Sequence, residues 1–263
     1  MMDEIAQYNT QRWKLLTKTN ALFTRPALQL DAASARQRID PEGRLGELTG
    51  KRVLCLASGG GQQSAIFGLL GAQVTVFDLS EEQLQRDRQV ADHYHLAITT
   101  EQGDMRDLTR FEEASFDLVW QPYSLNFIPE VLMVFRQITR LLPYDGRYYL
   151  QCTNPFSHGL AETDWNGEGY TLKYPYSDGA EIISRDPTWV SSSNLSQEQI
   201  PPPKEYRHTL STVVNGLAEQ GFIIQHLSDT FDMHPDASAN PGTWDHLVAY
   251  APPWLTFWTI YRP

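Results

Sequence analysis

Cysteine is almost absent from this sequence, and two cysteines, Cys55 and Cys152, are too few for a disulfide framework or a cysteine-based zinc site. Both fall in segments expected to be strands, with another strand between them. Neighbouring strands lie about 4.8 Å apart, so roughly 9 to 10 Å would separate the two residues, beyond the reach of a disulfide. We therefore expect two buried free thiols. Histidine and aspartate are too scattered to predict a metal site.

Long apolar runs and an excess of positive charge are also absent. The longest mainly apolar stretch, residues 65–79, is interrupted by Gly68, Gly71 and Gln73 and is too short for a transmembrane helix. The first residues are acidic where a signal peptide needs positive charge. With 21 Lys and Arg against 32 Asp and Glu, the formal charge of −11 disfavours binding to a phosphate backbone. We expect a cytoplasmic protein that binds neither nucleic acid nor a membrane; its oligomeric state stays open.

From residue 51 onward, short apolar runs alternate with longer amphipathic segments, which predicts parallel strands joined by right-handed helical crossovers. Strands are expected at 52–57, 73–78, 98–102, 116–120, 146–153, 222–228 and 254–261. Helices are expected at 62–70, 81–94, 129–142, 208–220 and 243–251. A hydrophobic content of 41% is enough to fill the core of such a domain.

Two segments lie outside this alternation. Apolar residues at loosely helical spacing, such as Ile5 and Trp13, predict an N-terminal helical cap over residues 1–48, ahead of a core at 49–153. After the fifth strand, the alternation stops over residues 154–207.

This insertion holds six prolines and seven aromatic residues, including Trp165, Tyr170, Tyr174 and Trp189. A segment of 54 residues without expected regular structure usually covers a site, so we expect a lid. Its aromatic side chains could surround a cationic or planar acceptor, or pack as a small satellite core. Residues 208–263 then complete the core sheet.

A glycine turn joins the first expected strand to the helix that follows, in the segment Val53-Leu54-Cys55-Leu56-Ala57-Ser58-Gly59-Gly60-Gly61-Gln62. Glycine lets the backbone approach a ligand closely, and a helix N-terminus offers unpaired N–H groups. Asp78 ends the second strand, where a carboxylate can accept both hydroxyls of a ribose. The alternative is that Asp78 or Ser80 caps the next helix. The joint presence of turn and strand-end acid favours ribose binding.

Gly103, Asp104 and Met105 follow the third strand, where Asp104 could accept from an adenine amine while Met105 packs on the ring. Together with Phe116-Asp117-Leu118-Val119-Trp120 and the turn Leu142-Pro143-Tyr144-Asp145-Gly146, this series resembles the class I S-adenosylmethionine (SAM) dependent methyltransferases in order and spacing. The resemblance is specific over residues 50–153 and weaker over 208–229 and 254–263.

The resemblance implies a doubly wound α/β fold with a seven-stranded, mostly parallel sheet of order 3-2-1-4-5-7-6, the last strand antiparallel, helices on both faces and a lid insertion. It implies SAM as cofactor and methyl transfer to a small molecule. The residues expected to hold the cofactor are Ala57, Ser58, Gly59, Gly61, Asp78, Leu79, Gly103, Asp104, Met105 and Gln121.

The sequence departs from the family pattern at three positions. Cys55 stands where the first motif usually has an acid, Ala57 replaces its first glycine, and Asn126 replaces a histidine that often follows the fourth strand. A thiol cannot hold a charged amine as a carboxylate would. We therefore expect backbone carbonyls near Ala57, together with Gln121, to bind the cofactor's amino group, and Asn126 to alter substrate contacts.

Two other functions share some of these features. An NAD(P)-dependent oxidoreductase would also use the glycine turn and Asp78, but Ser64 occupies the position of its third glycine-like residue, and a second mononucleotide-binding half is missing. A SAM-binding protein without methyl transfer also remains open, because binding residues do not establish catalysis.

Methyl transfer is an in-line displacement that depends mainly on holding the two reacting atoms in near-attack geometry. A hydroxyl or ammonium acceptor also needs a base, a role suited to histidine. The candidates are His158 and His208, with Tyr123 and Asn126 expected to border the transferred methyl group. Whether the acceptor atom is oxygen, nitrogen, sulfur or carbon stays open.

His158 is preferred because it follows the expected fifth strand by five residues and therefore stays near the mouth of the site. Asn154-Pro155 stiffens that exit. A purely structural His158 is the alternative, and His208 could instead anchor the helix that it begins. We expect His246 at the surface or a helix end, and His93 and His95 on a peripheral helix.

Overall fold

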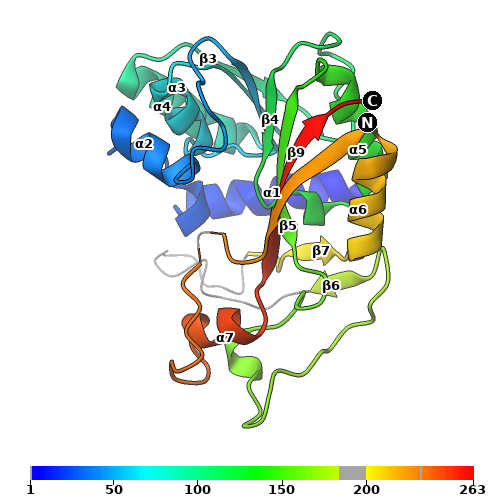
Figure 1. Cartoon of the computed structure of the whole chain (residues 1–263). Coiled ribbons are helices and arrows are strands. Elements are labelled where there is room, and N and C mark those ends of the chain that lie inside the picture. Colours follow the sequence, from blue (N-terminus) through cyan, green and yellow to red (C-terminus); the bar gives the residue numbers. More distant parts are fainter. Residues whose placement is uncertain (1, 184–199, 232) are drawn as a thin grey trace.

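The computed structural model describes residues 2–183, 200–231 and 233–263. Figure 1 shows a central sheet with helices on both sides. The helices on one side are α2 (Ala32–Ile39), α3 (Gln63–Leu69) and α4 (Glu81–Tyr94), and those on the other are α5 (Val131–Leu141) and α6 (Leu210–Glu219). This is the doubly wound α/β fold that the sequence predicts.

Seven strands form the main sheet in the order β3-β2-β1-β4-β5-β9-β8. Their bounds are β1 (Arg52–Leu56), β2 (Gln73–Asp78), β3 (Ile98–Gln102), β4 (Leu118–Gln121), β5 (Arg147–Thr153), β8 (Phe222–Ser228) and β9 (Trp254–Tyr261). Strands β1 to β5 pair in parallel, whereas β9 is antiparallel to both of its neighbours. The predicted order and the antiparallel last strand are confirmed, although β4 begins two residues later than expected.

The near-continuous apolar character of β1 follows from burial on both faces of the sheet. Val53 and Cys55 pack in the cluster that includes Phe67 of α3, whereas Leu54 and Leu56 pack in the cluster that includes Phe135 of α5. Alternate side chains of one strand therefore anchor helices on opposite faces, which fixes where the turn after β1 emerges.

Cys55 in β1 and Cys152 in β5 are buried free cysteines separated by β4, as predicted. Burial raises the pKa of the Cys152 thiol to about 12. Neither side chain is poised for thiolate chemistry, since the thiolate is the reactive form.

The insertion at 154–207 contains more regular structure than expected. A 3-10 turn lies at η3 (Glu162–Asp164), and β6 (Glu181–Ile183) pairs antiparallel with β7 (Lys204–Tyr206). The prediction of a stretch without regular structure is therefore wrong for these elements, because strands of three residues are too short to show an alternating pattern. Trp189 lies outside the described residues.

Within the described ranges, no helix is long and apolar enough to cross a membrane. The same part of the chain contains no group of three or more His, Cys, Asp or Glu side chains arranged to hold a metal ion. The remaining helices are α1 (Glu4–Lys18), which confirms the helical pattern near the N-terminus, and α7 (Trp244–Tyr250), which lies just before β9.

Helix α1 is tied to the sheet through Arg106. Asp3 begins the helix by accepting a hydrogen bond from the Ala6 N–H at 2.8 Å, and its other carboxylate oxygen lies 2.7 Å from Arg106 Nη1. Arg106 also pairs with Asp104, in the loop after β3, at 2.6 Å. The hydrogen bond from Arg106, followed by that from Ala6, lowers the pKa of Asp3 to about 2.

Replacing Asp3 by Asn should lower the free energy of unfolding by about 0.5 kcal/mol near pH 7, a small loss because the ion pair is half exposed and Asn still caps the helix. The folded-state pKa lies below the unfolded value of 3.8, so this contribution is present above that value and is lost as the pH falls towards about 2. Urea unfolding near pH 7 and near pH 3 measures it, with exposed Glu113→Gln as control. A difference from wild type that persisted unchanged at the lower pH would contradict the assignment.

Candidate active site

A cavity of about 1450 Å³ lies where β1, β2 and β4 end, with further walls from α1 and the insertion. Eight of the residues predicted to bind the cofactor line this cavity: Ala57, Ser58, Gly59, Asp78, Leu79, Gly103, Asp104 and Met105. The parallel register explains this convergence, because Leu56 pairs with Phe77 and Asp78 pairs with Gln102, so that three strand exits meet at one edge.

The glycine turn is held against Asp78. The Gly59 N–H donates to Asp78 Oδ2 at 2.9 Å, and the Ser80 N–H donates to Oδ1 at 2.8 Å. A side chain at Gly59 would place its Cβ 2.8 Å from the Cβ of Gln83, so only glycine fits beside this carboxylate. Each carboxylate oxygen keeps acceptor capacity towards the cavity.

Burial raises the pKa of Asp78, and the hydrogen bonds from the Ser80 and Gly59 N–H groups oppose that shift. Ser80, rather than Asp78, caps the next helix: its hydroxyl accepts a hydrogen bond from the Gln83 N–H at the start of α4. Asp78 therefore remains directed to the cavity and the turn.

Asp104 lies on the cavity wall in a bidentate ion pair with Arg106. The Arg106 Nη2 lies 2.6 Å from Asp104 Oδ2, and the Arg106 backbone N–H donates to Oδ1 at 2.9 Å. Much of the acceptor capacity expected to face an adenine amine is thus already used. Arg106 itself lines the cavity. It was not predicted from the sequence, because its partner Asp3 is far away in the chain and no local pattern links the two residues.

Two predicted cofactor residues do not lie on the cavity wall. Gln121 is fully buried, where its Oε1 accepts from the Tyr148 hydroxyl at 2.6 Å and its Nε2 lies 3.2 Å from the sulfur of Met105. The Gly61 N–H donates to Asp87 at 3.0 Å. The N–H groups expected to be unpaired at this turn are therefore engaged by a side chain.

A polar cluster on the cavity wall joins the insertion to the loop after β4. His158 Nε2 lies 2.7 Å from Glu205 Oε2, and the Tyr123 hydroxyl lies 3.3 Å from both oxygens of Glu205. His158 and Glu205 are each only 5% exposed, and all three residues line the cavity. Burial, reinforced by the charge of Glu205, raises the pKa of Tyr123 well above its usual value. His158 Nδ1 has no hydrogen-bond partner among the described residues.

The backbone around His158 is held from two sides. The Arg207 guanidinium donates to the His158 carbonyl at 2.8 Å, and the Ser157 hydroxyl donates to the Pro252 carbonyl at 2.6 Å. These contacts fix the backbone that carries the imidazole. No sequence pattern marks Glu205 as the partner of His158, because it lies 47 residues away in the short strand β7.

The other histidines occupy different environments. His208 lies outside the cavity wall, with Nε2 3.3 Å from the Leu125 carbonyl, and burial lowers its pKa. His246 lies in the first turn of α7, which agrees with the helix end expected for it. It is buried rather than at the surface, and its Nδ1 lies 2.8 Å from the Tyr170 hydroxyl. His93 lies in α4 and His95 caps its end, as expected.

Asn126 does not border the cavity as expected. It is 1% exposed, and its Oδ1 accepts from the Thr153 N–H at 3.1 Å. A side chain in the turn after β4 thus satisfies a backbone donor at the end of β5 instead of reaching towards a ligand, which corrects the expectation for this residue.

The aromatic residues of the insertion divide between cavity and core. Trp165 and Tyr170 pack with His246 and Tyr250 of α7, which is the satellite core weighed from the sequence. Tyr174 lines the cavity. The aromatic wall beside Tyr123 comes mainly from outside the insertion, in the set Phe127, Trp244 and Trp254.

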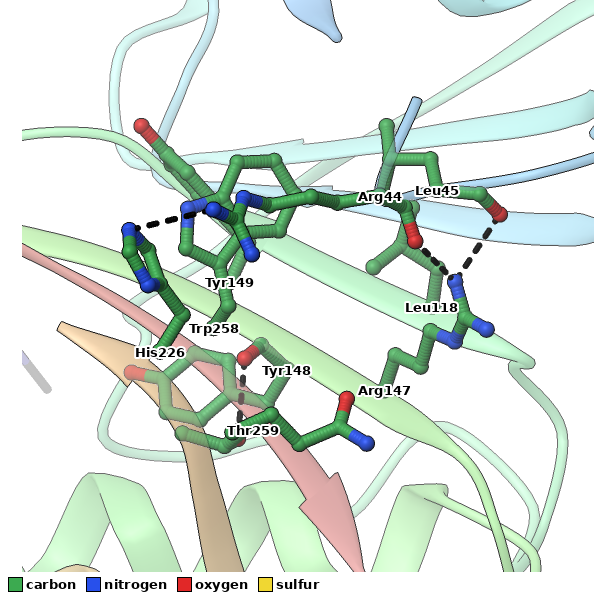
Figure 2. Close-up of a pocket in the computed structure, with 10 residues that line it drawn as sticks. Arg44, Leu45, Leu118, Arg147, Tyr148, Tyr149, His226, Trp258 and Thr259 are labelled. Carbon is green, nitrogen blue, oxygen red and sulfur yellow. Dashed lines mark hydrogen bonds between the residues drawn. The ribbon is translucent and has the colours of Figure 1, made fainter. Parts of the chain in front are cut away.

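A second cavity, of about 300 Å³, lies near the start of β5 (Figure 2). Arg44, Arg147 and His226 border it. The Arg147 guanidinium already donates to the Arg44 carbonyl at 2.7 Å, and Arg44 Nη2 lies 3.3 Å from His226 Nε2. None of the residues predicted to be functional lines this space, so the larger cavity is the candidate active site.

Comparison with known proteins agrees with this geometry. The family described as a methyltransferase domain matches residues 54–150. The uncharacterized methyltransferase YbaJ from Bacillus subtilis is 34% identical over 180 residues, which cover 67% of this chain and 68% of YbaJ. A ubiquinone biosynthesis O-methyltransferase from Xanthomonas oryzae pv. oryzae is 28% identical over 162 residues, which cover 61% of this chain and 64% of that protein.

The fold is also shared with a solved structure. The crystal structure of an S-adenosylmethionine dependent methyltransferase from Mesorhizobium loti matches 89% of this chain and 100% of its own, with a TM-score of 0.64 at 23% identity. The antiparallel pair β8 and β9 stands where a dinucleotide oxidoreductase would have part of a second mononucleotide-binding half. The chain therefore belongs to the SAM-dependent methyltransferases, and S-adenosylmethionine is its cofactor.

Proposed function

We propose that this enzyme methylates a small molecule whose acceptor atom carries a proton, and that His158 removes that proton. The observation that carries the proposal is the pair of His158 and Glu205 on the cavity wall, 2.7 Å apart and nearly fully buried. Ligand sites usually measure about 300 to 1,000 Å³, so a cavity of about 1450 Å³ leaves room for an acceptor beside the cofactor. The name of the Xanthomonas relative, an O-methyltransferase of ubiquinone biosynthesis, supports an acceptor of this class.

The residues at the strand exits fit the cofactor. Asp78 offers acceptor capacity on both oxygens, as a ribose with two hydroxyls needs, and Gly59 leaves space beside it that a Cβ would fill. Leu79 and Met105 supply apolar surface for the adenine. When bound, S-adenosylmethionine supplies a methyl group on a positively charged sulfur.

The contact with Glu205 gives the two nitrogens of the His158 imidazole different roles. An ionised carboxylate only accepts hydrogen bonds, so the imidazole nitrogen that faces Glu205, Nε2, carries the proton in the neutral ring. Nδ1 then holds the free electron pair. Glu205 would stabilise the positive charge that His158 gains when it takes a proton, and it acts as a positioning residue rather than touching the acceptor.

The aromatic wall and the insertion surround the position that we assign to the acceptor. Tyr123 and Trp254 pack edge to face with ring centroids 6.0 Å apart and present apolar surface beside His158. The described part of 154–207 contributes His158, Tyr174 and Glu205 to the wall, which supports its role as the cover of the acceptor side. Such a cover would exclude water from the methyl group.

Replacing Asp78 by Ala should weaken SAM binding by about 1 to 3 kcal/mol, because the ribose hydroxyls of SAM and the Gly59 N–H would lose their hydrogen-bond acceptor. Isothermal titration calorimetry measures the change, with exposed Glu112→Ala as control. Unchanged affinity in a folded Asp78 variant would remove the ribose assignment.

Replacing His158 by Ala should lower kcat about a hundredfold while leaving the Kd for SAM intact, because a base acts on the acceptor and not on the cofactor. Turnover is followed as S-adenosylhomocysteine release with a panel of small hydroxyl and amine compounds, with exposed His93→Ala as control. A His158 variant with full turnover would refute the role of His158 as the general base. A loss of kcat on His208→Ala without loss of stability would move the role to His208.

Replacing Glu205 tests its positioning role separately. Glu205→Gln should lower kcat less than Glu205→Ala, because the amide oxygen can still accept from His158 Nε2–H while the charge is gone. Neither change should alter the Kd for SAM. Equal losses in kcat and in SAM affinity would indicate that Glu205 only maintains the fold of the cavity.

A further inference from the structure

Asp87, on α4, is a buried acid that neither the cofactor site nor the proton transfer described above uses. It is 0% exposed, and its carboxylate accepts from the Gly60 N–H at 3.0 Å, the Gly61 N–H at 3.0 Å and the Ser64 hydroxyl at 2.5 Å. All three donors belong to the glycine turn or to the first turn of α3. A single carboxylate on one helix thus caps the beginning of another.

We propose that Asp87 is the positioning residue that holds the glycine turn in the shape that receives SAM, in place of the acid that is usual at the position of Cys55. The inference deepens the proposed cofactor site, because it concerns how that site is built and which charge it favours. Its first support is that the turn lacks a cap of its own: Gln62, at the N-cap of α3, makes no side-chain cap hydrogen bond.

The second support is the close packing of the turn. Gly60 and Gly61 have φ angles of +119° and +78°, and a Cβ at Gly61 would lie 2.8 Å from the Arg86 carbonyl oxygen. The turn is therefore pressed against the backbone of α4, beside Asp87. Without an acceptor there, two buried N–H groups would be unpaired and the turn would lose what fixes its conformation.

The third support is the position of Cys55. Cys55 packs in the same cluster as Leu84 of α4 and Phe67 of α3, so its side chain faces the two helices that Asp87 joins. Burial, and then the nearby charge of Asp87, raise the pKa of the Cys55 thiol well above its usual value. A carboxylate on α4 thus occupies the neighbourhood that an acid on β1 would reach. Burial also raises the pKa of Asp87 to about 7, although the hydrogen bonds from Ser64, Gly60 and Gly61 oppose that shift.

The consequence for the ligand is electrostatic. Asp78 takes the Gly59 N–H, and Asp87 takes those of Gly60 and Gly61, so consecutive donors of the turn are all paired with acids. A pyrophosphate held at a helix N-terminus needs such donors free. With two acids behind it, the turn favours the cationic end of SAM over an anion.

An exchange of the two positions tests the inference. Asp87→Ala should raise the Kd for SAM about 10- to 100-fold, and the double variant Cys55→Asp with Asp87→Ala should recover at least half of that loss on a logarithmic scale. Cys55→Asp alone should also weaken binding, because two carboxylates would then lie close together. Exposed Asp92→Ala, on the same helix, is the matched control.

Calorimetry gives the Kd values, and thermal unfolding without ligand reports whether each variant folds. A folded Asp87→Ala variant with wild-type affinity would overturn the inference, and so would a folded double variant that recovers nothing. If Asp87→Ala alone does not fold, folding and SAM binding by the double variant support the exchange, and a double variant that also fails to fold or to bind counts against it. Failure of the wild type to bind SAM would instead count against the cofactor site itself.

Discussion

The site depends on the parallel, in-register pairing of β1 with β2 and β4. This pairing ends neighbouring strands at one edge of the sheet, and the helices that cover both faces keep those ends fixed. Ala57, the residue after β1, has a φ of +47°, so the chain changes direction sharply as soon as the strand ends. Every contact assigned to the cofactor follows from that edge.

The two walls of the cavity differ in how they are built. The cofactor wall consists of the exits of successive parallel strands, whereas the acceptor wall combines the end of β5, the short strand β7 and the segment before β9. His158 and Glu205 meet only because the insertion folds back as the pair β6 and β7. The first wall suits a cofactor common to a family, and the second suits an acceptor particular to this chain.

The sequence predicted most of the sheet, because β2, β8 and β9 have strong apolar patterns bounded by turn residues. Eight of the ten residues that we expect to hold the cofactor line the cavity, because they lie at strand ends. The sequence did not predict Glu205, Asp87 and Arg106, since a single charged residue carries no periodic signal and its partners are set by tertiary packing. Helix α2 was not singled out, because Ala35 and Ile39 alone do not form an apolar stripe. The burial of His246 was not predicted, because its partner Tyr170 comes from the insertion.

The most direct test of this account is a crystal structure of the protein with S-adenosylhomocysteine. We expect both ribose hydroxyls within hydrogen-bond distance of the Asp78 carboxylate, the adenine beside Leu79 and Met105, and the sulfur directed to the side of the cavity that holds His158. A cofactor that made no contact with Asp78, or whose sulfur pointed away from His158, would contradict the account.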